Sequence, residues 1–403
     1  MNLIPSFIRS APGLAAFSVL AIAASGFGQT FFIAVFGSAI RDDFALSHTS
    51  YGLFYSGATL LAAIFLLRLG GIADCWRVHH VATLALFLLT IGCLLMGLAN
   101  HVLLLIAGFF LLRLGGQGLM AHIGLTTAGR YFPLQRGKVV ALTVSGFPLA
   151  EAILPVSAAL LIASFGWRSA WFGGAVFLLL VLLPLFWLLS RDAASPAEVD
   201  VDQPEAPGKH YGRAEVLSDP AFYLLLPAAL VTPFVVTGIL FHQAALAEAR
   251  GWSLTLFASA FTGYAAGHWL ALLIAGPLVD RISATRTLPL SLMPMLLAML
   301  LLAGFSAPWV PWVYLTLTGF TQGAMSASGG ALWPERYGVR RLGAIRSMVQ
   351  AVMIFATALA PVLVGALLDW QLGVAGVALL MAGATLVSAA LALLVRAPGS
   401  SAT

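Results

Sequence analysis

Residues Gly276–Arg286 read GPLVDRISATR and lie between two long apolar runs. The earlier stretch Gly70–His80 reads GGIADCWRVHH, again with a glycine, an aspartate four positions later and then basic residues. The two aspartates, Asp74 and Asp280, are offset by 206 residues, which is about half of the chain. The same offset separates other pairs, namely Arg130 and Arg336, Gly137 and Gly343, and Pro155 and Pro361. A period of this length indicates two copies of one module.

The composition indicates a protein of the lipid bilayer. The chain is 61% hydrophobic and only 9% charged, whereas soluble domains carry about a quarter charged residues. The apolar run after Arg9 is long enough to span a membrane, so we interpret it as a helix and not as a cleavable signal peptide. The two cysteines predict neither a disulfide framework nor a metal cluster. The net charge of +5 comes without a basic patch of interleaved aromatic residues, so no nucleic-acid partner is expected.

Twelve apolar runs approach the roughly 20 residues that a spanning helix needs. They lie near residues 13–39, 51–69, 80–98, 102–127, 139–164, 169–190, 220–246, 254–278, 287–305, 309–332, 346–368 and 373–395. We therefore predict an all-α membrane protein with twelve transmembrane helices in two six-helix bundles related by pseudo-twofold symmetry. The predicted parts are an N-terminal bundle over 1–190, a solvated acidic linker over 191–219 with a short amphipathic piece, and a C-terminal bundle over 220–403.

Lysine and arginine placement predicts the orientation of the chain. Sixteen of the twenty basic residues fall on the side of the termini and the central linker, and Arg113 falls inside a span. Only Arg41, Arg168 and Arg250 fall on the opposite side. Because cytoplasmic loops carry the excess of positive charge, both termini are predicted to be cytoplasmic. We expect a multi-pass protein of the bacterial cytoplasmic (inner) membrane.

Two charged residues lie deep in consecutive spans. Arg113 is in the fourth predicted helix and Glu151, the one acidic residue deep in a span, is in the fifth. Because charge in hydrocarbon costs several kcal/mol, such residues are functional candidates by default. Arg113 could hold an anionic substrate and Glu151 could carry a proton. The alternative is a fixed ion pair that joins the two helices, and burial and the arginine would shift the Glu151 pKa in opposite directions.

Polar and aromatic residues in the other spans extend the list of candidates. Gln117 lies four residues after Arg113 and is expected on the same helix face. His268 follows Tyr264 by four residues in the eighth helix, and either His242 or His268 could titrate near neutral pH. The alternative for each histidine is a neutral side chain that hydrogen-bonds between helices. The full set of predicted substrate-binding residues is Arg113, Gln117, Gln29, Tyr55, His242, Gln243, His268, Tyr264, Gln322 and Trp333.

Enzyme chemistry is not predicted. The sequence has no Ser/His/Asp or Cys/His arrangement, no cluster of metal ligands and no phosphate-binding glycine loop with its lysine. A nucleotide-binding domain that could power a pump is also missing. We therefore expect neither catalytic residues nor a metal or other cofactor.

The motifs resemble those of the major facilitator superfamily over essentially the whole chain. Gly276, Asp280, Arg281 and Arg286 match the signature of the loop between helices 8 and 9, and Gly70 and Asp74 form a degraded copy. The resemblance implies twelve helices in two bundles, a cavity lined mainly by helices 1, 4, 7 and 10, and alternating access. It also implies that these six residues serve gating, with Asp74 and Asp280 contacting nearby helix starts, where the helix dipole favours anions.

Within that superfamily the sequence looks most like the bacterial monocarboxylate and oxalate–formate branch. The resemblance lies in Phe27-Gly28-Gln29 and in Gly330–Gly338, GALWPERYG. His268 stands where this branch often has an arginine, and the lysine that the oxalate exchanger carries in helix 11 is absent. The drug-efflux signature of helix 5 is also incomplete, since Pro148 fits but Glu151-Ala152 replaces two glycines.

The main prediction is a secondary active transporter that moves a small, monocarboxylate-like organic anion by proton-coupled symport. Arg113 would be the anion anchor, and Glu151 with Arg113 would provide proton coupling. The first alternative is a proton antiporter that exports a drug or an amphipathic metabolite, and the second is a non-transporting membrane sensor or scaffold. The expected partners are the substrate, protons and membrane lipid, and the expected oligomeric state is a monomer.

Overall fold

The computed structural model describes residues 11–69, 72–132, 136–193, 211, 213–338 and 342–396, and within these ranges the chain contains helices and no strands. It divides into two compact units. Unit 1 comprises 1–46 and 50–202, and unit 2 comprises 47–49 and 203–403. Each unit holds one of the two copies that the 206-residue repeat predicts.

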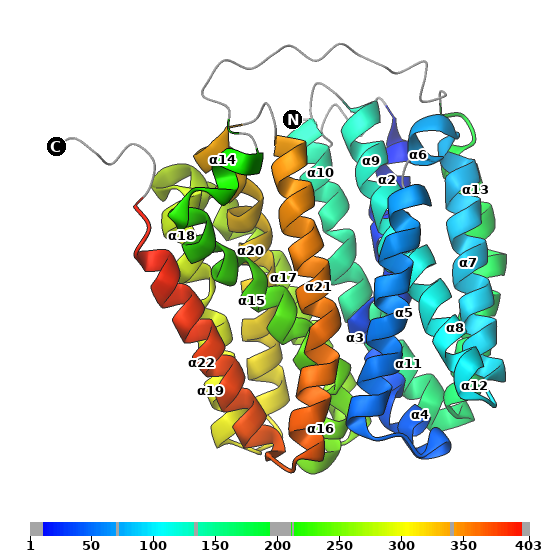
Figure 1. The fold of residues 1–403 in the computed structure, drawn as a ribbon. Helices are drawn as coiled ribbons and strands as arrows, with labels where there is room; N and C mark the ends of the chain where they lie inside the picture. The colour runs from blue at the N-terminus through cyan, green and yellow to red at the C-terminus, as the bar shows by residue number, and fades with distance from the viewer. Residues whose placement is uncertain are drawn as a thin grey trace, which may run out of the picture. The chain divides into compact units, whose positions relative to one another are not determined.

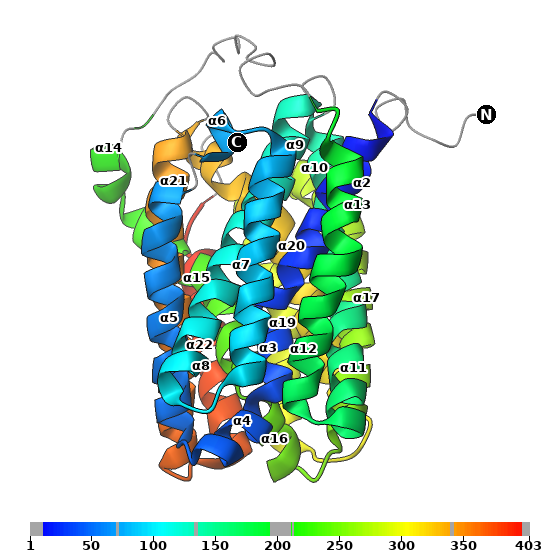
Figure 2. The ribbon, with the colours of Figure 1, turned by 90° about the vertical axis from the view of Figure 1, so that its right-hand side faces the viewer.

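Unit 1 contains the first half of the helices (Figure 1). In chain order these are α2 (Pro12–Ser25), η1 (Gly26–Gly28), α3 (Thr30–Ile33), η2 (Ala34–Phe36), α4 (Gly37–Phe44), α5 (His48–Leu69), α6 (Ile72–Cys75), α7 (Val78–Leu98), α8 (Val102–Leu112), η3 (Arg113–Met120), α9 (Ala121–Tyr131), α10 (Arg136–Val144), α11 (Gly146–Phe165), α12 (Trp167–Phe177), η5 (Leu178–Leu182) and α13 (Leu183–Ser190). Helices α12 and α13 pack along α7 (Figure 2).

Unit 2 contains the remaining helices. They are α14 (Arg213–Leu217), α15 (Pro220–Phe241), α16 (Gln243–Ala249), α17 (Leu254–Ile282), α18 (Ala284–Ser291), α19 (Met293–Gly304), α20 (Val310–Tyr337), α21 (Leu342–Asp369) and α22 (Gly373–Leu393). The short helix α14 lies in the linker that was predicted to contain an amphipathic piece. The predicted run 220–246 is interrupted, because α15 ends at Phe241 and α16 begins at Gln243.

The described helices account for the predicted apolar runs. Ten of them are long and apolar enough to cross a membrane, or eleven if the bent pair Pro12–Gly28 and Thr30–Phe44 is one span. The predicted run 309–332 forms α20, a helix of 28 residues that is not among those ten. It is long enough to cross, at about 1.5 Å per residue, but it carries more polar residues than the others.

Large apolar side chains point outward from both units. Leu67 is 85% exposed, Phe165 and Leu393 are each 70% exposed, and many other leucines and phenylalanines are more than half exposed. In water such a surface would be a liability, but in a bilayer it faces lipid tails of the same polarity. The helices themselves satisfy the backbone hydrogen bonds internally, as the hydrocarbon requires.

The first span is broken near its middle. Its two parts meet at an angle of 45°, where η1 tightens the chain into a 3₁₀ turn and Gln29 adopts an extended conformation with φ −86° and ψ 153°. A Cβ at Gly28 would lie 2.1 Å from the Leu112 carbonyl oxygen and 2.8 Å from Cα of Gly116. The break therefore brings two glycine backbones into direct contact, which places η1 against η3.

In unit 2, α17 and α20 pack at the same close range along most of their length (Figure 1). A Cβ at Gly267 would lie 2.2 Å from the Thr316 carbonyl oxygen, and one at Gly319 would lie 2.0 Å from the Tyr264 carbonyl oxygen. Gly323 approaches the His268 carbonyl oxygen in the same way, at 2.3 Å. Small residues at helix contacts allow backbones to approach closely in membrane proteins. The spacing of these glycines thus fixes the register of α17 against α20.

We predict that Gly319→Ala destabilises the protein while Gly329→Ala, in the same helix, does not. The added methyl group at Gly319 meets a backbone atom that cannot move aside, which costs about 1–3 kcal/mol. Nothing lies within 4 Å of a Cβ at Gly329, so alanine there can only favour the helix, by up to about 1 kcal/mol. Thermal unfolding of the two purified variants in one detergent checks this. Equal melting temperatures would show that the α17–α20 contact tolerates a wider separation.

Candidate functional site

Arg113 lies near the middle of the apolar segment Val102–Tyr131, at the point where α8 changes into the π-helical segment η3. This segment reads RLGGQGLM, and its glycines weaken the regular helix. π-Helical turns are rare and frequently occur at functional sites. The arginine is only 3% exposed, so its charge is removed from water at mid-span.

The guanidinium group of Arg113 is held by the broken first span. Its Nη1 donates a hydrogen bond to the Gly28 carbonyl oxygen at 2.8 Å, and its Cζ lies 5.1 Å from the centroid of the Tyr55 ring. Its Nε is buried and has no hydrogen-bond partner among the described residues. The positive charge is thus met by a carbonyl dipole and an aromatic face, which stabilise a cation without neutralising it.

Tyr55 connects this arginine to α3. Its hydroxyl and that of Thr30 form a hydrogen bond of 2.8 Å, and its ring packs edge-on against Phe109 at 5.6 Å between centroids. Sequence reasoning included Tyr55 but missed Thr30. The available signal was its position directly after Gln29, in a span already known to contain glycines.

The two glutamines of unit 1 differ from the arginine in exposure. Gln117 is exposed although Arg113 is buried. Gln29 is partly exposed rather than buried. The backbone nitrogen of Gln117 lies against Gly28, 2.9 Å from where a Cβ would be. Arg113, Tyr55, Gln29 and Gln117 therefore surround the break in the first span.

Glu151 is 4% exposed and lies on α11. Its neighbour Ala150 packs against Gly26, since a Cβ on that glycine would lie 2.9 Å from the Ala150 Cβ. Hence α11 and η3 contact the same broken segment. The fixed ion pair between Arg113 and Glu151, one of two sequence interpretations, is not formed by the arginine, whose described contacts are Gly28 and Tyr55.

In unit 2, the α17–α20 contact brings three predicted residues to one region. The rings of Tyr264 and His268 meet edge-on at 6.3 Å, as expected for residues four apart on one helix face. Both are 2% exposed. Gln322 is partly exposed and precedes Gly323, which packs on the His268 backbone.

His242 and Trp333 lie far apart within unit 2. His242 follows the last residue of α15, and its Nε2 is 2.8 Å from the Pro361 carbonyl oxygen, with Gln243 fully buried beside it. Trp333 packs at the other end of α15, 5.5 Å from Phe222 and 6.2 Å from Tyr337 between ring centroids. Twenty residues of helix separate Phe222 from His242, about 30 Å. Trp333 therefore cannot line a small-molecule site with His242, and it acts as packing.

At the Trp333 end of unit 2, two carboxylates cap helix starts. Glu335 accepts hydrogen bonds from the backbone nitrogens of Ala284 (2.6 Å) and Thr285 (3.3 Å) at the start of α18. Asp219 accepts from the Ala221 backbone nitrogen at 3.0 Å, at the start of α15. Carboxylates stabilise helix starts in this way because the free N–H groups and the dipole both favour an anion.

The predicted gating residues of unit 2 lie next to this capped end. Gly276, Asp280 and Arg281 lie in the last two turns of α17, and Arg286 is on α18. Asp280 is exposed, and the helix start beside it is capped by Glu335 instead. The expected contact of Asp280 with a helix start is thus not found among the residues that the structure describes. Gly70 and the side chain of Asp74 lie outside those residues.

A second pair of contacts joins Asp219 to the end of α20. Its Oδ2 accepts hydrogen bonds from Arg336 Nε at 3.1 Å and from the Tyr337 hydroxyl at 2.9 Å. Burial works to raise the pKa of Asp219, but the bonds from Ala221, Tyr337 and Arg336 outweigh it and hold the pKa below 3.8. Glu335 lies in the stretch Gly330–Gly338 on which the sequence resemblance rests, whereas no motif singled out Asp219.

A helical protein of two repeated modules, with many membrane-crossing helices and a buried charge at mid-span, has the architecture of a secondary transporter. The model of the Major Facilitator Superfamily matches residues 18–258 and 236–403. The chain belongs to this superfamily, and it is a multi-pass integral membrane protein. Family membership confirms the predicted family and fold, and it places the chain among transport proteins rather than enzymes.

Two comparisons give more specific relatives. A hexuronate transporter of Bacillus subtilis (strain 168) is 30% identical over 155 residues, which are 37% of this chain and 34% of that protein. The match thus spans about a third of the length of this curated relative. Two structures of a bacterial homolog of the human lysosomal transporter Spinster have a TM-score of 0.67 each.

The two Spinster-homolog structures, in inward-facing unoccupied and occupied conformations, are similar to this chain in fold alone. The unoccupied one is 15% identical, with 94% of each chain covered. The occupied one is 16% identical and covers 97% of this chain and 95% of its own. Neither comparison identifies the monocarboxylate and oxalate–formate branch, which therefore stays a prediction.

The Asp219 contacts predict a defined pH dependence of stability. The depressed pKa means that Asp219 stabilises the fold fully above pH 3.8, and that this contribution is lost as the pH falls through its lower folded value. We expect Asp219→Asn to be less stable than the wild type at pH 7, by about 1–2 kcal/mol, with the difference shrinking below pH 4. Thermal unfolding between pH 3 and 7 measures it. The exposed Asp42→Asn variant is the control, and a difference that is as large at pH 3 as at pH 7 would contradict the prediction.

Proposed function

We propose that this protein is a secondary active transporter that moves a small organic anion by alternating access, coupled to protons in symport. The single observation that carries the proposal is the state of Arg113. Its guanidinium group is buried at mid-span, hydrogen-bonded to a neutral carbonyl group and stacked on Tyr55, with its Nε unpartnered among the described residues. We infer that the missing counter-charge is supplied by the substrate.

The energetics favour this interpretation. A buried charge with an incomplete set of partners costs several kcal/mol, and a protein retains such a cost where the charge has a task. An arginine presents five N–H donors in a planar fork that fits a carboxylate with two parallel hydrogen bonds. When a substrate carboxylate binds, Arg113 exchanges its weak contact with the Gly28 carbonyl group for a pair of charge-assisted hydrogen bonds. The exposed Gln117 lies one turn away and provides the side from which an anion approaches.

The relatives support the substrate class. One similar protein bears the name of a hexuronate transporter, and a hexuronate carries a carboxylate. The sequence resemblance to the monocarboxylate and oxalate–formate branch points in the same direction. We propose a substrate with one carboxylate and a small polar body, for which Tyr55, Gln29 and Gln117 provide polar contacts in unit 1. In unit 2, Tyr264, His268, Gln322, His242 and Gln243 remain the proposed binding residues.

Glu151 is the proposed proton carrier. It is a buried carboxyl group on a helix that packs against the same break as Arg113. Because both groups act on one broken segment, a change in the charge of either alters the electrostatic environment of the other. A proton on Glu151 and an anion at Arg113 would cross together in the same direction, as symport requires.

The efflux alternative rests on the aromatic residues of the spans, and the packing of those in the core of unit 1 speaks against it. Phe27 packs on Phe32 at 5.1 Å, and Phe32 packs on Trp171 at 5.4 Å between ring centroids. All three are at most 7% exposed. These rings fill the core of the unit, so they do not offer the open aromatic surface that an amphipathic drug requires.

The remaining expectations complete the proposal. The distribution of lysine and arginine supports cytoplasmic termini in a bacterial inner membrane, and a monomer suffices because each chain contains both modules. The residues Gly70, Asp74, Gly276, Asp280, Arg281 and Arg286 are proposed to act in gating.

We predict that Arg113→Met loses substrate binding without losing stability. Replacing the arginine by an apolar side chain of similar length removes an uncompensated charge, so the substrate-free protein should unfold at the same temperature or higher. The affinity for hexuronates and monocarboxylates should fall by at least about tenfold, the usual scale for a charge-assisted contact. Ligand-induced thermal shifts in detergent measure both properties. An unchanged shift would refute the anchor, and a large loss of substrate-free stability would mark the arginine as structural.

We predict that Glu151→Gln uncouples transport from protons. Glutamine mimics the protonated side chain, so exchange of substrate across liposome membranes should continue while accumulation driven by a pH gradient is lost. A pH-sensitive dye inside the liposomes gives the direction of proton flux. Protons that enter with the anion support symport, and protons that leave as a drug enters support the efflux alternative. Retained pH-driven accumulation in Glu151→Gln would show that another group carries the proton.

A further inference from the structure

A hollow of about 630 Å³ opens on the surface of unit 1 around the turn between α6 and α7. Its lining includes Trp76, Arg77, His80, Leu84 and Phe87. It is separate from the Arg113 region, which is buried inside the unit. None of the functions considered above uses it.

The lining residues form one stripe along the start of α7. Arg77, His80, Leu84 and Phe87 are spaced by three, four and three residues, so they fall on a single helix face. The stripe is about 15 Å long. Its first part is basic and its second part is apolar, so the hollow changes from a charged end to a hydrocarbon-like end along the direction in which the helix enters the membrane.

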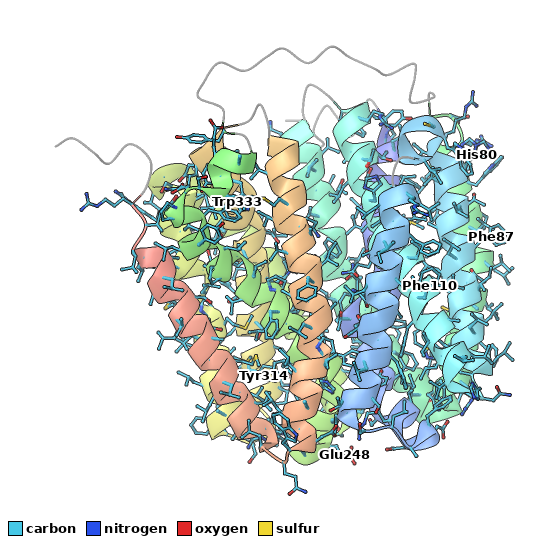
Figure 3. All side chains as sticks on the ribbon, in the orientation of Figure 1. His80, Phe87, Phe110, Glu248, Tyr314 and Trp333 are labelled. Atoms are coloured by element: carbon cyan, nitrogen blue, oxygen red, sulfur yellow. The ribbon has the colours of Figure 1, made fainter. Side chains whose placement is uncertain are left out.

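The side chains are accessible from outside. Trp76 is 47% exposed and Phe87 is 45% exposed, and His80 and Phe87 project from the outer face of α7 (Figure 3). Tryptophan favours the boundary between hydrocarbon and water because its ring is apolar and its N–H is a donor. Trp76 therefore places the basic end at headgroup level and the Leu84–Phe87 end at the depth of the lipid tails.

We propose that this hollow binds one anionic phospholipid. The phosphate group contacts Arg77 and a ring N–H of His80, and one acyl chain lies along Leu84 and Phe87. Arginine matches phosphate oxygens with two parallel hydrogen bonds. No described side chain caps the start of α7. The positive end of the α7 helix dipole therefore adds to the attraction for the phosphate group. The proposal depends on the membrane location of unit 1 and is independent of the proposed substrate.

Charge and shape together select this occupant. A free phosphate would contact the basic end and leave the apolar half of the stripe uncovered. A second copy of the chain would cover the apolar half but would have to present an acidic group to Arg77 and His80. An anionic phospholipid satisfies both halves at once, because its charge and its hydrocarbon are joined at the right separation.

Native mass spectrometry of the purified full-length protein tests the proposal. The probes are phosphatidylglycerol, phosphatidylcholine and soluble glycerol phosphate, and the variants are Arg77→Gln/His80→Gln and, as a control, Lys138→Gln. Lys138 is an exposed lysine of the same unit outside the hollow. We expect the wild type and Lys138→Gln to retain one phosphatidylglycerol in preference to phosphatidylcholine. The double variant should bind phosphatidylglycerol at least about fivefold more weakly, the scale of one basic residue at an anionic surface.

Each other outcome overturns the assignment. Equal phosphatidylglycerol binding by the double variant and the wild type would mean that the retained lipid sits elsewhere. Displacement of the lipid by glycerol phosphate at millimolar concentration would show a site for a soluble phosphate. A dimer whose population falls in the double variant would identify a second copy as the occupant. A further variant, Phe87→Ser, should weaken lipid binding without changing the preference for the anionic headgroup.

Discussion

The structure of unit 1 depends on how a positive charge is kept inside a membrane-crossing helix. Arg113 can be buried because the first span breaks beside it and turns the Gly28 carbonyl toward its Nη1. The break is possible because residues 28 and 116 have no side chains, so two backbones meet where a methyl group would clash. One carbonyl group and one aromatic ring make the charge tolerable. The glycine contact, the π-helical segment and the exposed Gln117 all serve this arrangement.

The two modules have diverged at this position. Aligning Gln117 with Gln322 places Thr318 of unit 2 opposite Arg113. Thr318 is buried and bonds back to the Tyr314 carbonyl oxygen in its own helix. Unit 2 also has close glycine packing, but between a different pair of spans, α17 and α20, and no charge stands at the position equivalent to Arg113. The two modules therefore differ at this position, with a buried arginine in one and a buried threonine in the other.

The comparison of sequence and structure shows which inferences were limited by helix geometry. Spacing along one helix correctly paired Tyr264 with His268. Spacing could not relate residues on different helices, so Trp333 and His242 entered one candidate site. Trp333 packs against Phe222, which lies about 30 Å from His242 along α15. Thr30 was missed because only its position directly after Gln29 distinguishes it from a threonine in any span.

The sequence alone determined that the chain lies in a membrane, that it is a duplicated helical module, and that it carries a charge at mid-span. These properties follow from composition, run length and repeat offset, which are sums over many residues and tolerate local error. Only the tertiary structure decided what each polar group contacts. It gave Arg113 a carbonyl partner instead of Glu151, and it gave Glu335 the cap expected of Asp280. Whether a hydrogen bond forms depends on differences of a few tenths of an ångström in the distance between helices, and the order of residues along the chain does not contain that information.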